Sequence, residues 1–168
     1  MRERSHTKGR VYQRDVKHWL SRYRFLGFET ELFGDAYDVT KKACTIGKLV
    51  FDFSLRLGRG ELARHILYGE CKYRDERRGN VNTDFKEFLK RVYQALATAE
   101  PDEADSAVFV FVSNVPPDDW RRYLRNKQAY CRADLDWDPS NPLDEELLAK
   151  VAGVVHLLVL SAAIIVSE

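Results

Sequence analysis

The chain has 168 residues, of which 45% are hydrophobic and 12% aromatic, enough to bury the core of one compact domain. Its 27 basic and 26 acidic residues leave a net charge of only +1, so the overall charge does not indicate nucleic-acid binding and any basic surface must be local. Three widely separated cysteines without a C-x-x-C motif argue against a disulfide framework or a zinc site. They indicate a reducing cytosol, so we expect a cytoplasmic protein.

The N-terminal part of the chain predicts an arm, a helix and a short strand. Residues 1–8 are charged and lack the apolar run of a secretory signal, so we expect a flexible arm there. Residues 9–27 carry apolar side chains at helical spacing and end on a glycine, and residues 28–33 follow as a strand. In the next turn, Asp35 and Asp38 are possible ligands, although loop acids usually cap the backbone or face solvent.

Residues 48–74 predict a two-stranded hairpin around which the rest of the chain is organised. Because side chains alternate between the faces of a strand, the first strand has Asp52 on one face and an apolar opposite face. That apolar face consists of Leu49, Phe51, Phe53, Leu55 and Leu57. In the second strand, Glu70 and Lys72 share a face. An antiparallel register with Leu57 opposite His65 places Asp52 opposite Glu70, with Cβ atoms about 5 Å apart, and a bulge would shift this register by one residue.

Two carboxylates this close repel each other unless a cation lies near them. Mg²⁺ is a hard ion that proteins typically bind through one or two carboxylates, together with water and substrate phosphate. A neighbouring ammonium can orient the attacking water or help to deprotonate it. The group of Asp52, Glu70 and Lys72 therefore indicates phosphodiester hydrolysis, whereas the alternative is a solvated outer face with ordinary charges.

At these residues the chain resembles the PD-(D/E)-x-K nucleases, the restriction-endonuclease-like superfamily. The resemblance rests on Asp52 in the first strand and on Glu70-Cys71-Lys72 in the second, and no proline precedes Asp52. It implies that Asp52 and Glu70 bind Mg²⁺, with Mn²⁺ as a substitute. It also implies that the backbone carbonyl of Cys71 completes the coordination and that Lys72 positions or polarises the attacking water.

Many members of this superfamily also carry a glutamate on the first helix. The nearest residue here is Gln13, and Asp15 is a second candidate, so a ligand, an amide contact and a contribution from Asp15 all stay open. The resemblance covers roughly residues 9–126. It implies an α/β fold with an αβββαβα core, in which helices flank a mixed central sheet. We therefore divide the chain into the arm, a nuclease-like core at 9–127, and a C-terminal part at 128–168 that packs on this core.

Basic residues follow the hairpin and recur on two later helices. One predicted helix runs to residue 99 with a cap at Asn82 or Thr83, and its apolar stripe comprises Phe85, Phe88, Leu89, Val92 and Leu96. Another predicted helix spans residues 118–127. Guanidinium and ammonium groups bind phosphate well, although a solvated helix face or turn needs no ligand. The candidate nucleic-acid contacts are Arg74, Arg77, Arg78, Lys86, Lys90, Arg121, Arg122 and Arg125.

The remaining segments predict core elements and loops. Residues 107–112 form a continuous apolar run, which is typical of a buried strand that is parallel to its neighbour. Residues 101–105 predict an acidic loop, and residues 128–141 an irregular loop that Trp137 pins to the body. A last helix begins near Pro142, and its apolar continuation fits either a helix or an edge strand. That apolar run spans 16 residues, short of the about 20 of a membrane helix, so we expect no membrane contact.

The sequence therefore predicts an Mg²⁺-dependent nuclease that hydrolyses DNA, with restriction, repair and phage defence equally open. No G-x-x-x-x-G-K-S/T loop is present, so we expect no bound nucleoside triphosphate. Because the length leaves no room for a separate recognition domain, specificity would come from loops, from a homodimer partner or from a larger defence or repair assembly. The alternative is a catalytically silent copy of the fold that binds nucleic acid or a protein partner.

Overall fold

The computed structural model describes residues 2–22, 28–33, 44–57, 63–74, 80–135, 137 and 142–161. Some residues of the sequence predictions lie outside these ranges, namely Asp35, Asp38, Arg77, Arg78 and the end of the apolar tail. Among the described residues, no helix combines the length and the apolar character needed to cross a bilayer.

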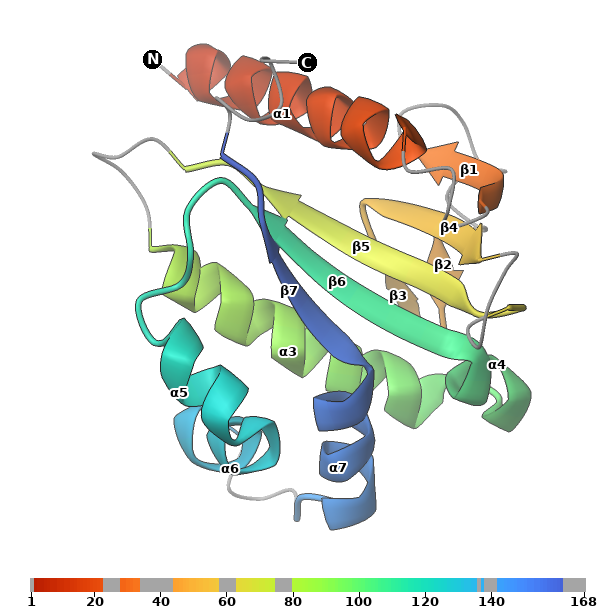
Figure 1. The fold of residues 1–168 in the computed structure, drawn as a ribbon. Coiled ribbons are helices and arrows are strands. Elements are labelled where there is room, and N and C mark those ends of the chain that lie inside the picture. The colour runs from red at the N-terminus through yellow and green to blue at the C-terminus, as the bar shows by residue number, and fades with distance from the viewer. Residues whose placement is uncertain are drawn as a thin grey trace.

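A mixed sheet lies at the centre of the fold, so the expected α/β class with helices flanking a mixed sheet is confirmed (Figure 1). Its five strands lie in the order β1-β4-β5-β6-β7 and are β1 Phe28–Phe33, β4 Phe53–Leu57, β5 Ile66–Lys72, β6 Ala107–Ser113 and β7 Val155–Val159. The first three of these strands pair antiparallel, whereas β5, β6 and β7 pair parallel. Two short strands, β2 Thr45–Ile46 and β3 Leu49–Val50, form a separate antiparallel ribbon.

Helices cover both faces of the sheet (Figure 1). One face is covered by α1, and the other by α3 with α5, α6 and α7 below it. Their bounds, with those of the short helix α4, are α1 Arg2–Arg22, α3 Val81–Thr98, α4 Pro101–Ser106, α5 Trp120–Arg125, α6 Lys127–Asp134 and α7 Glu145–Val154. This arrangement buries both faces of β6, which explains why that strand shows no polar alternation.

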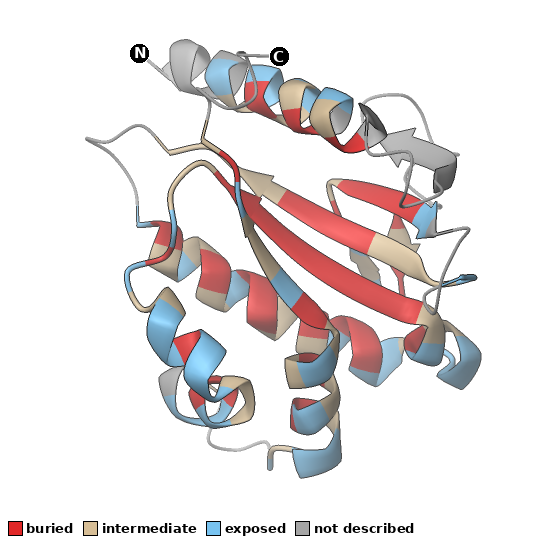
Figure 2. Ribbon diagram, in the orientation of Figure 1, coloured by how far each residue is buried: buried red, intermediate tan, exposed pale blue. Residues whose placement is uncertain are grey.

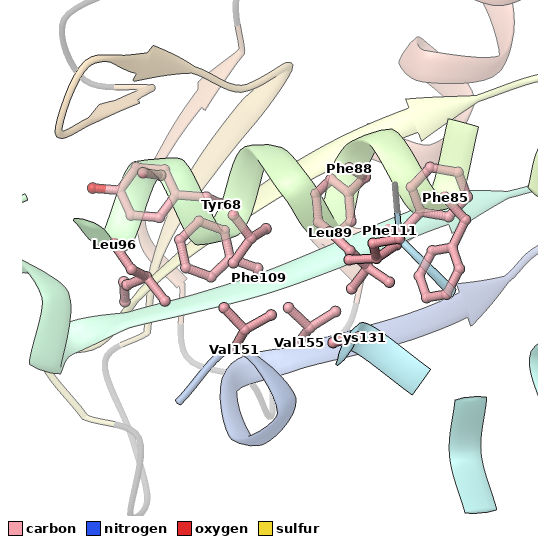
Figure 3. Close-up of a cluster of buried hydrophobic side chains, with 14 of the residues drawn as sticks. Tyr68, Phe85, Phe88, Leu89, Leu96, Phe109, Phe111, Cys131, Val151 and Val155 are labelled. Carbon is pink, nitrogen blue, oxygen red and sulfur yellow. The ribbon is translucent and has the colours of Figure 1, made fainter. Parts of the chain in front are cut away.

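Two hydrophobic cores hold the layers together, one on each side of the sheet (Figure 2). The larger core joins α3 to β6, where Phe85 and Phe88 pack against Phe111 (Figure 3). The whole predicted stripe of α3 is buried, so that prediction is confirmed. Each side chain of this size contributes about 1.5–3 kcal/mol when fully buried. The smaller core joins α1, through Tyr12 and Val16, to the other face of the sheet.

The register of the hairpin is the predicted one. Phe53 pairs with Gly69 and Arg56 with Ile66, which is the same alignment that sets Leu57 opposite His65. The bulge that would have shifted it does not occur between β4 and β5. The second strand of the hairpin therefore presents its residues as the alternation predicted.

The first strand, by contrast, is not continuous. β3 ends at Val50 and β4 begins at Phe53, with a bend at Asp52 between them. Phe51 therefore packs in the core on the α3 side and Phe53 in the core on the α1 side, so the prediction that they share one face is wrong. The physical reason is that side chains at this bend take the place of backbone hydrogen bonds between strands. The carboxylate of Asp52 accepts from the backbone amide of Cys71 on β5, and the side chain of Arg91 donates to the carbonyl of Val50.

The N-terminal half otherwise follows the sequence prediction, with shifted helix ends. The strand at 28–33 is confirmed. The first helix begins at Arg2, so residues 2–8, expected to form a flexible arm, are helical. Asn80 caps α3 rather than Asn82 or Thr83, because its side chain accepts the hydrogen bonds of the two free amides at those positions.

The C-terminal part contains more regular structure than predicted. Residues 127–134 form α6, where an irregular segment was expected, and residues 101–106 form a one-turn helix rather than a loop. The buried stripe of α6 is only Tyr130 and Cys131, too short a pattern to indicate a helix from the sequence. Trp137 itself is held against α6, since its indole donates to the carbonyl of Cys131 at 2.8 Å, whereas residues 136 and 138–141 of the predicted loop lie outside the described ranges. For residues 155–159 of the tail, the choice between helix and edge strand is settled by β7, an edge strand parallel to β6.

Candidate active site

Glu70 and Lys72 lie at the carboxyl end of β5, on the face of the sheet that α3 covers. Tyr68, two residues earlier on the same strand face, packs in the core on the α3 side. Glu70 is only 5% exposed, and its neighbour on β6 is Phe111. A carboxylate this deeply buried needs charged or hydrogen-bonding partners, because its desolvation is otherwise unfavourable. The alternation of side chains along β5 therefore places Glu70 in the hydrophobic layer between the sheet and α3.

Asp52 reaches the same place from the bend between β3 and β4. Its Oδ2 accepts a hydrogen bond from the backbone amide of Cys71 at 2.8 Å, which fixes the carboxylate beside the end of β5. Burial, followed by the charge of Glu70, raises the pKa of Asp52 from 3.8 to about 6. Lys72 and Arg91 act in the opposite direction but do not offset these effects. The ionised form of Asp52 is thus unfavourable mainly because the carboxylate is buried, and secondly because Glu70 carries a charge of the same sign.

Lys72 completes the predicted triad. Its Nζ lies 2.7 Å from Oε1 of Glu70. Burial lowers the pKa of Lys72, but the charge and hydrogen bond of Glu70 and the charge of Asp52 outweigh this effect, so the pKa lies above its ordinary value. The side chain is therefore an ammonium at neutral pH. It can donate a hydrogen bond and stabilise negative charge, whereas it cannot serve as a general base in this state.

Arg91, from the middle of α3, is a member of the site that the motif did not identify. Its Nη1 lies 2.6 Å from Oε2 of Glu70, and Nη2 donates to the carbonyl of Val50. The guanidinium carbon also lies 5.1 Å from the ring centre of Phe51. The sequence gives one indication that Arg91 belongs to the site. Arg91 follows Phe88 by three residues on the helix, which places it at the border of the apolar stripe. Polar residues off a stripe are usually solvated, so this signal alone was weak.

The first helix contributes an indirect contact. The side-chain amide of Gln13 donates to the backbone carbonyl of Asp52 over a long 3.5 Å, and does not reach the carboxylate. Asp15 instead accepts hydrogen bonds from Arg14 at 3.2 and 3.3 Å. Of the two candidates on this helix, the structure therefore brings Gln13 to the site, as a support for the bend, and not Asp15.

The chain just after Lys72 is held by Asn114, the residue that follows the end of β6. The amide of Asn114 accepts from the backbone nitrogen of Arg74 at 2.7 Å and donates to its carbonyl at 2.8 Å. These two bonds continue the pairing of β5 with β6 beyond the last pair, Lys72 with Ser113. Asn114 thereby holds the chain in register where it leaves the site.

Three of the predicted nucleic-acid contacts are engaged within the protein. The guanidinium of Arg74 forms a two-pronged ion pair with Asp84. Lys86 lies 3.9 Å from a carboxylate oxygen of Asp119 and over the ring of Tyr130, and Lys90 lies 3.3 Å from a carboxylate oxygen of Glu87. Their charges are thus partly compensated.

The arginines of α5 are the more accessible group. Arg121, Arg122 and Arg125 are all exposed, and Arg121 lies over the ring of Trp120. The helix is anchored by Tyr123, whose ring packs on Phe85 in the first turns of α3. Because α3 begins near the carboxyl end of β5, α5 lies at the same end of the sheet as the acid pair (Figure 1).

The donor set suits a hard cation better than a soft one. Within the ranges that the structure describes, no three side chains of the His, Cys, Asp and Glu types gather into one group. The acid pair of Asp52 and Glu70 has only oxygen donors, and Mg²⁺ typically takes one or two carboxylates and keeps several waters. The unfavourable charge of Asp52 beside Glu70 is the feature that a divalent ion would relieve. The residues present thus fit such an ion.

No protein family, curated protein or solved structure matches this chain.

Proposed function

We propose that this protein is an Mg²⁺-dependent nuclease that hydrolyses DNA phosphodiester bonds. The observation that carries the proposal is the acid pair of half-buried Asp52 and buried Glu70 next to the ammonium of Lys72. Two neighbouring carboxylates with an ammonium beside them, in a partly exposed site, are the groups that metal-assisted hydrolysis uses.

The order of the elements supports the family resemblance. A helix, three strands, a helix, a strand and a helix follow one another as α1, β1, β4, β5, α3, β6 and α5, once the small ribbon of β2 and β3 and the short helix α4 are set aside. This is the αβββαβα order of the restriction-endonuclease-like core. We therefore propose that fold for the chain, with β7 as an additional edge strand.

Asp52, Glu70 and the carbonyl of Cys71 would hold the ion. The amide and carbonyl of one strand residue point toward the same neighbour, so the amide of Cys71, bonded to Asp52, indicates that its carbonyl faces the same side. When bound, the ion stabilises negative charge on the phosphate and lowers the pKa of water. Lys72 donates a hydrogen bond that orients the attacking water, and Gln13 steadies the bend that carries Asp52.

Substrate binding is assigned to the exposed arginines of α5. Helix α5, which carries Arg121 and Arg125, lies at the end of the sheet where the parallel strand β5 ends (Figure 1). Guanidinium groups bind phosphate oxygens with two parallel hydrogen bonds. With a net charge of +1, the protein has no long-range attraction for DNA as a whole. Binding would therefore depend on this local group.

The test is cleavage of plasmid DNA by the wild type and by Asp52→Asn, Glu70→Gln and Lys72→Met. We expect cleavage in Mg²⁺ or Mn²⁺, none in EDTA, and a loss of at least about a hundredfold in each variant, because general acid–base and metal catalysis contribute on this scale. Asp105→Asn is the matched control, since it also neutralises an acid, but one that is exposed and pairs with Lys150 instead of with a residue of the site. Full activity in all three site variants would refute the proposal.

One observation favours a second candidate, a catalytically silent module that binds nucleic acid or a protein. Both oxygens of Glu70 are already paired, with Lys72 and Arg91, and these contacts neutralise the acid without a metal. A silent module should show no change in melting temperature with Mn²⁺, whereas a metal enzyme is stabilised by any ion that binds its folded state.

A further inference from the structure

We propose that Arg91 competes with the metal ion for Glu70 and keeps the affinity for the ion low until substrate arrives. This inference rests on the proposed nuclease function and assigns a positioning role to a residue outside the motif. It starts from the contact between Nη1 of Arg91 and Oε2 of Glu70 at 2.6 Å. That oxygen belongs to an acid that would hold the ion.

Arg91 is fixed from three directions. Besides Glu70, it donates to the carbonyl of Val50, and its guanidinium lies over the ring of Phe51. These contacts come from the bend that also carries Asp52. The positive charge thus stays next to the acid pair even when an ion displaces it from Glu70. A flexible surface arginine would simply turn away into solvent.

The net charge of the site shows why Arg91 would weaken the binding of the ion. Asp52 and Glu70 carry two negative charges, and Lys72 and Arg91 two positive charges, so the four side chains sum to zero when both acids are ionised. A divalent ion raises that sum to +2 in a partly buried region, where like charges repel strongly. Without Arg91 the remaining three side chains sum to −1, and the ion raises that sum only to +1. The negative phosphate of a substrate offsets the excess, so metal and substrate should load together.

The experiment is calorimetric titration of the full chain with Mn²⁺ alone at pH 8, in the wild type and in Arg91→Met. Methionine retains an apolar stem against Phe51 and removes the charge. We expect Mn²⁺ to bind about tenfold more tightly to the variant, while its melting temperature in EDTA falls because Glu70 has lost a partner. Arg91→Gln replaces Arg91→Met if the latter does not fold, since it removes the same charge and keeps a donor for Val50.

Two further variants separate this effect from net charge and from packing. Lys150→Met removes one positive charge from an exposed pair with Asp105 and should leave the Mn²⁺ affinity unchanged. Arg91→Lys keeps the charge and should retain the weak affinity of the wild type. A purely structural role for Arg91 predicts lower stability in every Arg91 variant without tighter binding.

The possible outcomes distinguish the two proposals. Equal Mn²⁺ affinity in the wild type and Arg91→Met overturns the role of Arg91 and leaves the nuclease proposal standing. Binding to Arg91→Met with none to the wild type supports the competition in its strongest form. No binding to either protein overturns the proposed function, and the inference with it.

Discussion

Among single residues, Asp52 is the position where the proposed function and stability oppose each other. Its carboxylate is held by the amide of Cys71, but burial and the nearby charge of Glu70 make its ionised form unfavourable. A side chain selected for stability alone would be neutral here. The strain is therefore consistent with a residue whose charge serves a ligand.

Asp52→Asn should stabilise the metal-free protein at neutral pH. The folded pKa of about 6 lies above the ordinary 3.8, so the wild type loses stability as the pH rises from about 4 to 6, and the variant does not. At pH 7.5 in EDTA we expect the variant to be more stable by about 2 kcal/mol, and its amide oxygen can still accept from Cys71. Chemical denaturation at pH 7.5 and pH 4 measures this, and the difference should nearly vanish at pH 4. A destabilised variant at pH 7.5 would contradict the account of Asp52.

At the scale of elements, β5 organises the site because its alternate residues meet different partners. Gly69 lies beneath the ring of Phe53 on the α1 side, Glu70 faces α3, and the amide of Cys71 points in the plane of the sheet to Asp52. A Cβ added at Gly69 would lie 1.9 Å from the ring of Phe53, which is fully buried. The glycine thus allows an aromatic ring to cover the strand next to the acid.

Gly69→Ala should therefore destabilise the protein by about 2 kcal/mol or more, because the buried ring has little room to move. Phe53→Leu in the same chain should recover part of this loss, and the double-mutant cycle should give a coupling free energy of about 1 kcal/mol. Urea denaturation of the four proteins provides the values. Additive effects of the two substitutions would show that the ring does not set the requirement for glycine.

Much of this element was predictable from the sequence, and the rest was not for physical reasons. Strand alternation showed which residues share a face of β5, and the register that we assumed for the hairpin is the one observed. The break at Asp52 was hidden because it depends on a side chain replacing a ladder bond with Cys71, which no periodicity encodes. Arg91 was missed as a site residue for the same reason, since its role depends on which strand lies beneath α3.

At the scale of the whole molecule, the layers bring one sheet edge and two helices to the same end. The carboxyl ends of β5 and β6, the start of α3 and the basic helix α5 all meet there (Figure 1). Ligands of open α/β sheets generally bind at the carboxyl ends of the parallel strands. The position in the fold and the chemistry of the residues thus both indicate this end of the molecule as the ligand-binding end.

DNA binding should depend on salt through the arginines of α5. In EDTA, fluorescence anisotropy with a short duplex should give a log–log salt slope that falls by about two in the double variant Arg121→Gln/Arg125→Gln, close to one per lost phosphate contact. Arg132→Gln on α6, where the side chain pairs with Glu145, is the control and should keep the wild-type slope. An unchanged slope in the double variant would remove α5 from the binding surface.

The central claim is that Asp52 and Glu70 together bind a divalent cation. The most direct measurement is an anomalous difference map from crystals of the wild type grown with Mn²⁺. We expect a peak in contact with both carboxylates and with the carbonyl of Cys71. A map without a peak at these carboxylates, with Glu70 still paired to Lys72 and Arg91, would contradict this claim.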